Sequence, residues 1–147
     1  MGTYYNRIEG DVMNHKDYSR KGILYEAFID IMFQSNDEEE CSDIITMWSG
    51  DFDSIMDLIP LNNEEMYVAL AFHYQVDTPW EVRDDEPWEV DEIELSLKQL
   101  IDVRSILQEK ENSKNAPSVL CHICDDMCEM FQKANNKQGK VFIKYYY

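Results

Sequence analysis

The sequence predicts a single-domain, mainly α-helical bundle of about five helices. Apolar residues recur at helical spacing in several segments, with capping residues before them and Pro or Gly after them. The 147 residues suffice for one compact domain over residues 1–147 and are few for two. The closing VFIKYYY alternates as a strand does and could pair with 3-TYYNRI-8, so an α+β fold with a small terminal strand pair is the alternative.

Three helices are expected in the N-terminal part of the chain. In residues 17–34, Leu24, Phe28 and Ile31 have the spacing of an amphipathic helix that packs on a core. The stretch SNDEEE offers an N-cap and acids that suit the positive end of a helix dipole, which predicts a second helix through residues 41–48. A short third helix is expected over residues 51–59, before Pro60.

The remaining helices are expected in the second half. Residues 62–76 have capping-box spacing but many strand-forming side chains, and a helix is predicted there. Asp91 is expected to cap the clearest helix, which runs through VDEIELSLKQLIDVRSILQEKE with a continuous apolar stripe. The last long helix begins at Ser118 and ends in the turn-rich 135-NNKQGK-140.

The negative charge is concentrated in the middle of the chain. The net charge is −17 at pH 7, and residues 36–92 carry 18 acidic groups and 1 basic group, while the two flanking segments are nearly neutral. Like charges gathered in this way repel one another in the folded state, and a cationic partner would relieve the repulsion. A solvated acidic face that keeps the protein soluble is the alternative interpretation.

The stretch 79-PWEVRDDEPWEV-90 repeats Pro-Trp-Glu-Val and is expected to form a proline-stiffened loop. Tryptophans are frequent interface anchors, and carboxylates around them attract the Lys and Arg of a partner. For either tryptophan singly, packing back over the bundle is the alternative. The residues expected to bind a partner are Trp80, Glu81, Asp84, Asp85, Glu86, Trp88 and Glu89, together with Asp51 and Asp53.

The four cysteines are expected to be free thiols, as suits a reducing compartment. Cys121, Cys124 and Cys128 fall on one face of the last expected helix, where His122 or His73 could complete a zinc site. One straight helix rarely wraps three ligands around a tetrahedral ion, so packing as small apolar side chains is expected instead. No metal and no other cofactor is predicted.

The sequence carries no motif of an enzyme. None of its three histidines lies in a recognisable nucleophile motif, and there is no phosphate-cradling glycine loop. Asp51 and Asp53 superficially suggest a calcium loop, but the required glycine and bidentate glutamate are missing. Carboxylates are so numerous that no particular pair indicates acid–base catalysis. These absences predict a binding protein and not an enzyme.

Direct nucleic-acid binding and membrane insertion are not expected. Binding phosphates requires a basic patch, and the cationic residues near the end of the chain, Lys133, Lys137, Lys140 and Lys144, form only a modest one. No apolar run approaches the roughly 20 residues of a membrane-spanning helix. The N-terminal MGTYYNRIEGDVM lacks the apolar region of a signal peptide. A cytoplasmic location is therefore expected.

In size, acidic charge and lack of catalytic motifs, the whole chain resembles the immunity proteins of bacterial toxin systems, such as those of contact-dependent inhibition. The resemblance implies stoichiometric inhibition of a cognate toxin, whose basic nuclease domain would be the partner. It assigns no role to any residue. The alternative is a phage-type mimic of nucleic acid, an anti-restriction or anti-CRISPR protein that inhibits a host defence enzyme. Genomic neighbourhood would separate the two.

Overall fold

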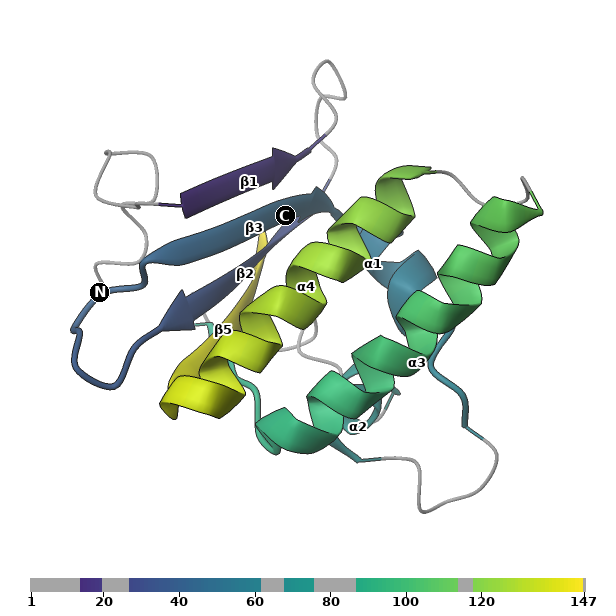
Figure 1. Ribbon diagram of the computed structural model, residues 1–147. Helices are drawn as coiled ribbons and strands as arrows, with labels where there is room; N and C mark the ends of the chain where they lie inside the picture. The colour runs from purple at the N-terminus through teal and green to yellow at the C-terminus, as the bar shows by residue number, and fades with distance from the viewer. Residues whose placement is uncertain (1–13, 20–26, 62–67, 76–86, 114–117, 147) are drawn as a thin grey trace.

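The computed structural model describes residues 14–19, 27–61, 68–75, 87–113 and 118–146, and within them the chain forms an α+β fold (Figure 1). The elements in chain order are β1 (Asn14–Tyr18), β2 (Phe28–Gln34), β3 (Asp43–Trp48), α1 (Ser49–Met56), α2 (Ala69–Gln75), β4 (Trp88–Glu89), α3 (Ile93–Asn112), α4 (Ser118–Lys137) and β5 (Lys140–Tyr146). The expected mainly α bundle of about five helices is wrong, because segments predicted to be helical are strands of one mixed sheet.

The five strands follow the spatial order β1-β3-β2-β5-β4. Strands β2 and β3 are antiparallel neighbours, as are β2 and β5, and β4 pairs antiparallel with β5. Strand β1 runs parallel to β3. The register places Ile31 of β2 opposite both Ile45 of β3 and Ile143 of β5. Residues far apart in the sequence therefore meet at the centre of the sheet.

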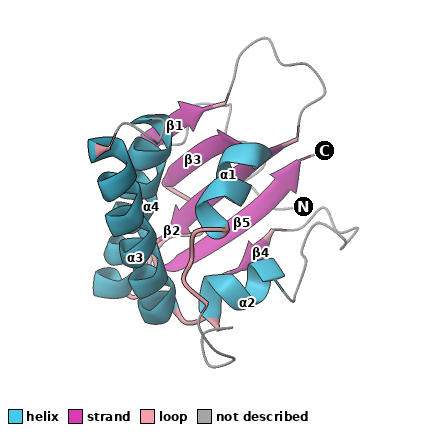
Figure 2. Cartoon of the chain, turned by 90° about the vertical axis from the view of Figure 1, so that its right-hand side faces the viewer, coloured by secondary structure: helices cyan, strands magenta, loops and turns pink. Residues whose placement is uncertain are grey.

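The helices pack on one face of this sheet, and the main core lies between them and the strands. Helix α4 contacts β2, β3 and β5, α1 contacts β2 and β3, and α3 packs along α4. Figure 2 shows α1 over the strands, with α3 and α4 side by side next to it. From β2, the alternate residues Ile29, Ile31 and Phe33 enter the core, where they join Phe131 of α4. Successive side chains of a strand point to opposite faces of the sheet, so these alternate residues all point to the face that the helices cover.

The second face of the sheet is also buried at its centre. Met32 of β2, Ile44 of β3 and Cys41 form a smaller apolar cluster there, against which Phe142 of β5 packs. In β2 this burial of both faces removes the alternation of apolar and polar residues that marks a strand in sequence. Its FIDIMF run is nearly continuous in apolar residues, and such a run is compatible with either a helix or a buried strand.

The two long helices predicted in the second half are confirmed, with one corrected boundary. Of the helix predicted over residues 62–76, α2 forms residues 69–75, while residues 62–67 and 76 lie outside the described residues. Helix α3 buries Leu97, Leu100, Val103 and Leu107 of its apolar stripe. Its N-cap is Glu92, in the left-handed region at φ 53°, and no side chain caps the helix there, so the expected cap at Asp91 is wrong. Helix α4 and the terminal strand β5 lie where the sequence places them, whereas residues 3–8, the expected partner of β5, lie outside the described residues.

Helix α4 ends in a Schellman turn. Gln138 is left-handed at φ 54°, and the N–H of Gly139 donates to the carbonyl oxygen of Ala134 at 2.9 Å. The turn delivers the chain directly into β5. Within the described ranges, no helix combines the length and apolar character needed to cross a membrane.

Candidate partner-binding surfaces

The predicted partner-binding loop is only partly described. Trp80, Glu81, Asp84, Asp85 and Glu86 lie outside the described residues, so their placement stays a prediction. Trp88 and Glu89 form β4, whose register sets them opposite Ile143 and Phe142 of β5. The Trp88 side chain is half-buried and packs against the main core, while that of Glu89 is exposed. Trp88 thus attaches the edge strand to the core, and Glu89 faces solvent.

The other two predicted residues lie on α1 and differ in exposure. Asp51 is 4% exposed and lies in the first turn of the helix, where a carboxylate suits the dipole. Asp53 is exposed, and the Tyr74 hydroxyl donates to its Oδ1 at 3.2 Å. Partial burial raises the pKa of Asp53, and the nearby Asp57 adds to the rise, while the Tyr74 hydrogen bond opposes it. Of the predicted pair on α1, Asp53 is the one open to a partner.

The residues Asp37, Glu38, Glu39 and Glu40 form an acidic turn between β2 and β3, where the sequence predicted the start of a helix. All four side chains are exposed, and hydrogen bonds hold the backbone of Glu38. The N–H of Glu38 donates to the carbonyl of Ser35 at 3.1 Å, and Nε2 of Gln34 donates to the carbonyl of Glu38 at 2.7 Å. The carboxylates therefore project from an ordered support.

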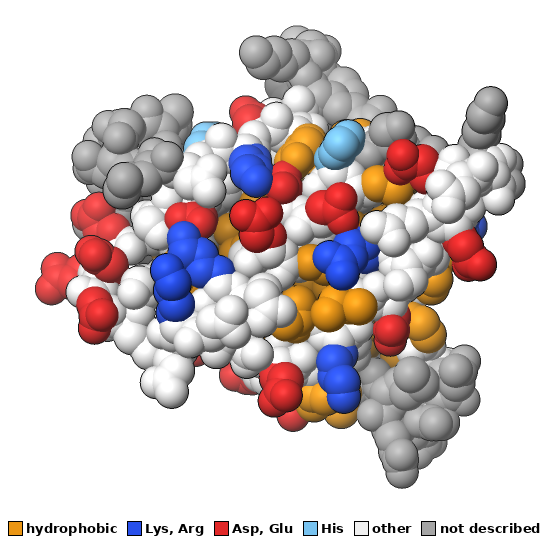
Figure 3. All heavy atoms as spheres, viewed as in Figure 1, with side chains coloured by type: hydrophobic (Ala, Val, Ile, Leu, Met, Phe, Trp, Pro, Cys, Tyr) orange, Lys and Arg blue, Asp and Glu red, His pale blue; other side chains and the backbone are white. Residues whose placement is uncertain are grey.

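The described carboxylates of residues 36–92 gather in separate groups instead of one patch. The acidic turn lies at one end of β3, and α1, with Asp53 and Asp57, follows its other end. Glu89, Asp91 and Glu92 form a third exposed group between β4 and α3. The acidic turn lies at the left of Figure 1, and Figure 3, from the same side, shows acidic side chains gathered at that edge. Elsewhere on this face, acidic and basic side chains alternate.

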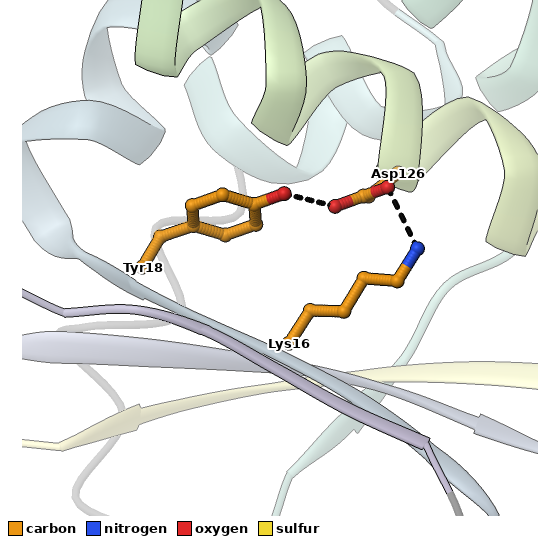
Figure 4. Close-up of polar contacts among 3 residues, drawn as sticks. All are labelled: Lys16, Tyr18 and Asp126. Carbon is orange, nitrogen blue, oxygen red and sulfur yellow. Dashed lines mark hydrogen bonds and ion pairs between the residues drawn. The ribbon is translucent and has the colours of Figure 1, made fainter.

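Asp126 of α4 joins the helical layer to the edge strand β1 (Figure 4). It accepts from Nζ of Lys16 at 2.9 Å and from the hydroxyl of Tyr18. Both donors come from alternate residues of β1, which point to the same face. The hydrogen bond to Asp126 raises the pKa of Lys16. Nearby, Nζ of Lys133 lies 3.0 Å from Oδ2 of Asp43.

A cavity of about 90 Å³ lies beside this junction. Its walls include both ion pairs, whose four charges compensate one another, and the carboxylate residue Glu129. The volume is small against the roughly 300–1,000 Å³ of sites that take small molecules. The two hydrogen bonds to Asp126 hold β1 against α4.

Titration of Tyr18 should destabilise the fold at high pH. Burial first, and then the hydrogen bond to Asp126, raise the pKa of Tyr18 above its ordinary value of 10.0. The folded protein thus holds this proton more tightly than the unfolded chain, so its stabilising contribution is complete below about pH 10 and is lost as pH rises further. We expect the free energy of unfolding, measured with urea from neutral pH to about pH 11, to fall less steeply in Tyr18→Phe than in the parent. If the free energy of unfolding falls with pH as steeply in Tyr18→Phe as in the parent, Tyr18 does not cause the loss of stability.

A row of polar side chains crosses the second face of the sheet and was missed by sequence reasoning. The Thr46 hydroxyl of β3 donates to Oδ1 of Asp30 at 2.5 Å, and Nε2 of His15 lies 2.9 Å from the Thr46 oxygen. A carboxylate can only accept, so the single hydroxyl proton is directed to Asp30 and His15 is the donor to Thr46. Lys144 of β5 stands directly opposite Asp30 in the register, and both are buried. The available signal was a lone Asp inside the apolar run of β2.

The cysteines of α4 are free, buried and directed toward α3. The thiols of Cys121 and Cys124 lie 3.6 Å and 3.5 Å from the carbonyl oxygens of Leu107 and Leu100. Among the described residues, no group of three His, Cys, Asp or Glu side chains has the arrangement of a metal site. The α4 thiols belong to the helix–helix packing.

Comparison with known proteins assigns no relationship. No family model matches the chain, and neither a curated protein nor a solved structure is significantly similar to it.

Proposed function

We propose that this protein is an acidic cytoplasmic binding protein that neutralises a basic protein partner by stoichiometric association. The partner class that best fits is a toxin nuclease domain, which would make the protein an immunity protein. The observation that supports the proposal most is the concentration of the charge of −17 in residues 36–92. The acidic turn, from Asp37 to Glu40, exposes four of these carboxylates on an ordered backbone.

An ordered acidic turn is suited to recognising cations. Hydrogen bonds from Glu38 to Ser35 and from Gln34 to Glu38 hold part of its backbone, which reduces the backbone entropy lost on docking. Exposed carboxylates accelerate the encounter with a cationic protein and set its orientation. Lys16 binds Asp126, and Lys133 binds Asp43, so this one carboxylate of residues 36–92 is compensated within the chain.

Nucleases are a suitable partner class because binding the phosphate backbone requires a basic surface. A protein that covers such a surface with carboxylates inhibits the enzyme without any chemistry of its own. This mechanism requires no catalytic group and no cofactor in the inhibitor, in keeping with the binding protein predicted from the sequence.

The test is affinity purification of the tagged protein, identification of the captured partner by mass spectrometry, and kinetics of the purified pair. The variant Glu38→Gln/Glu39→Gln/Glu40→Gln should lower the association rate constant by about tenfold or more at low salt and weaken its salt dependence. The matched control, Asp102→Asn/Glu109→Gln/Glu111→Gln, removes the same charge from exposed positions of α3.

The outcomes separate the possible explanations. If both triple variants lower the association rate constant equally, net charge alone controls binding. If the Glu38/Glu39/Glu40 variant leaves the rate constant unchanged, the acidic turn is not part of the interface. A captured nuclease toxin whose activity is blocked at a one-to-one ratio supports the immunity function. A captured host defence enzyme would favour the nucleic-acid mimic and overturn the proposal.

A further inference from the structure

A groove of about 640 Å³ runs between α3 and α4 on the outer side of the helical layer. Leu97 and Ile101 of α3 and several polar side chains of α4 line it. Figure 3 shows apolar surface between these two helices with basic side chains beside it. The acidic turn lies on the side of the molecule away from α3 (Figure 1), so the groove is a second surface, separate from the one proposed for the basic partner.

Four charged side chains of α4 line the groove in a row whose charge changes sign at its middle. They follow one another at every fourth residue, along one ridge of the helix, and are Asp125, Glu129, Lys133 and Lys137. The first two are acidic and the last two are basic, so the row has no net charge. Arg104 of α3 adds one positive charge to the same groove. This face is therefore not acidic, in a chain whose net charge is −17.

Neither the helix dipole nor the ion pairs of the fold account for this row. Asp125 and Glu129 lie beyond the first turn of α4, where the dipole has little effect. Asp125, Glu129 and Lys137 are exposed and take part in neither of the ion pairs that join α4 to β1 and β3. Lys133 is in one of them, with Asp43, but its ammonium has three N–H groups and donates one there. The row is thus available to another molecule.

We propose that this face binds a second copy of the chain, with the two α4 helices antiparallel across a two-fold axis that passes between Glu129 and Lys133. A two-fold axis brings residue i of one copy against residue j of the other, and j against i. The row then sets Asp125 against Lys137 of the partner subunit, and Glu129 against the partner's Lys133, and each pair occurs twice. Rows at four-residue spacing are also the ridges through which helices most often pack on one another.

The size of this face suits a dimer of modest affinity. Leu97 and Ile101 contribute apolar surface that a second copy would cover. Helices α3 and α4 each have 20 residues, about 30 Å in length and about 10 Å in width, so the pair presents a face of about 600 Å². Two such faces would bury about 1,200 Å², at the lower end of stable interfaces. The acidic surfaces elsewhere on the two copies repel each other and weaken the association.

The test is sedimentation equilibrium of the purified protein over a series of concentrations, at about 0.15 M salt, where a Debye length of about 8 Å screens the long-range repulsion. The parent is expected to show a monomer–dimer equilibrium. Asp125→Lys and Lys137→Asp should each raise the dissociation constant by about tenfold or more, because like charges then face each other in both symmetric contacts. The matched controls Glu109→Lys and Lys110→Asp change the charge equally at exposed positions of α3 outside the groove, and should dimerise as the parent does.

A mixture of the two groove variants is the decisive measurement. Asp125→Lys has a cation at both ends of the row and Lys137→Asp has an anion at both ends, so a dimer with one copy of each has opposite charges in both contacts. We expect the equimolar mixture to recover the dimerisation of the parent. Asp125 and Lys137 are about 18 Å apart along α4, so no contact within one chain can cause this recovery.

Several results would overturn the proposal. A parent protein that stays monomeric at every concentration would do so, as would unchanged dimerisation in either groove variant. Equal losses in the control variants would mean that net charge alone controls the association. A mixture that stays monomeric, with each variant folded by circular dichroism, would exclude the antiparallel two-fold arrangement. None of these results bears on the acidic turn, whose own test measures association with the basic partner.

Discussion

Asp30→Ala should destabilise the protein by about 1 to 3 kcal/mol, which is the usual effect of leaving buried polar groups without a hydrogen-bond partner. Asp30 is fully buried on the second face of the sheet, and Lys144, 6% exposed, stands directly opposite it on β5. The substitution also removes the acceptor of the Thr46 hydroxyl. The buried ammonium and hydroxyl would then be left with poorer partners, and each such group is costly. Urea unfolding followed by circular dichroism measures the change in free energy.

The matched control replaces both charges together. Asp30→Leu/Lys144→Met replaces both buried charges with apolar side chains, and such double replacements are often neutral or stabilising. We expect the double variant to be more stable than either Asp30→Ala or Lys144→Ala. If Asp30→Ala proves as stable as the parent, or if the double variant shows the two single losses added together, the two side chains do not depend on each other.

Gly139→Val should destabilise the protein by about 3 kcal/mol, at the upper end of overpacking effects. A Cβ at this position would lie 2.4 Å from the ring of Phe33 and 2.9 Å from the carbonyl oxygen of Gln34. The Phe33 ring is 1% exposed within the main core, so it has little room to move, and Gln34 presents backbone. The clash of the substituted valine side chain with these atoms can therefore be relieved only by moving the end of α4 away from β2. A decrease in the midpoint of urea unfolding is the expected readout.

The adjacent residue provides the control for backbone conformation. Gln138 has the left-handed φ of 54° that glycine adopts without strain, so Gln138→Gly should be neutral or slightly stabilising. The pair separates two uses of glycine in one turn, since position 138 needs a positive φ and position 139 needs the missing Cβ. Equal effects of the two substitutions would contradict this division.

The sequence predicted the two long helices, whose burial is one-sided. Helix α3 alternates buried Leu97 and Leu100 with exposed Lys98 and Asp102, so its period is visible without tertiary information. The same holds for α4, whose apolar face packs on the sheet and α3. The turn-rich residues before β5 and the alternation inside it also sufficed to place that strand.

The sequence wrongly predicted helices where β2 and β3 lie, because both faces of these strands are covered. In β2, Ile31 enters the main core and Met32 the smaller cluster, and consecutive buried positions imitate the i, i+3, i+4 pattern of a helix. The acidic turn strengthened the error, because Ser35 followed by acids is also what a helix N-terminus shows. Tertiary burial outweighed these local signals.

For the candidate surfaces, the sequence identified the charge but not its arrangement. The excess of carboxylates in residues 36–92 was evident from counting, whereas their division among the acidic turn, α1 and the start of α3 depends on the fold. The buried row of Asp30, Thr46 and Lys144 could not be found, since its members come from three different strands and meet only through the register.

The position of β5 between β2 and β4 has a consequence for biosynthesis. This strand follows every other described element in the chain, yet it lies inside the sheet. While a ribosome is still producing residues 140–146, β2 has one unpaired edge and β4 has no neighbour, so the growing chain cannot complete its native pairing. A chaperone that shields exposed strand edges would act during that interval, and stalling translation just before Lys140 should leave a nascent chain that proteases cut readily.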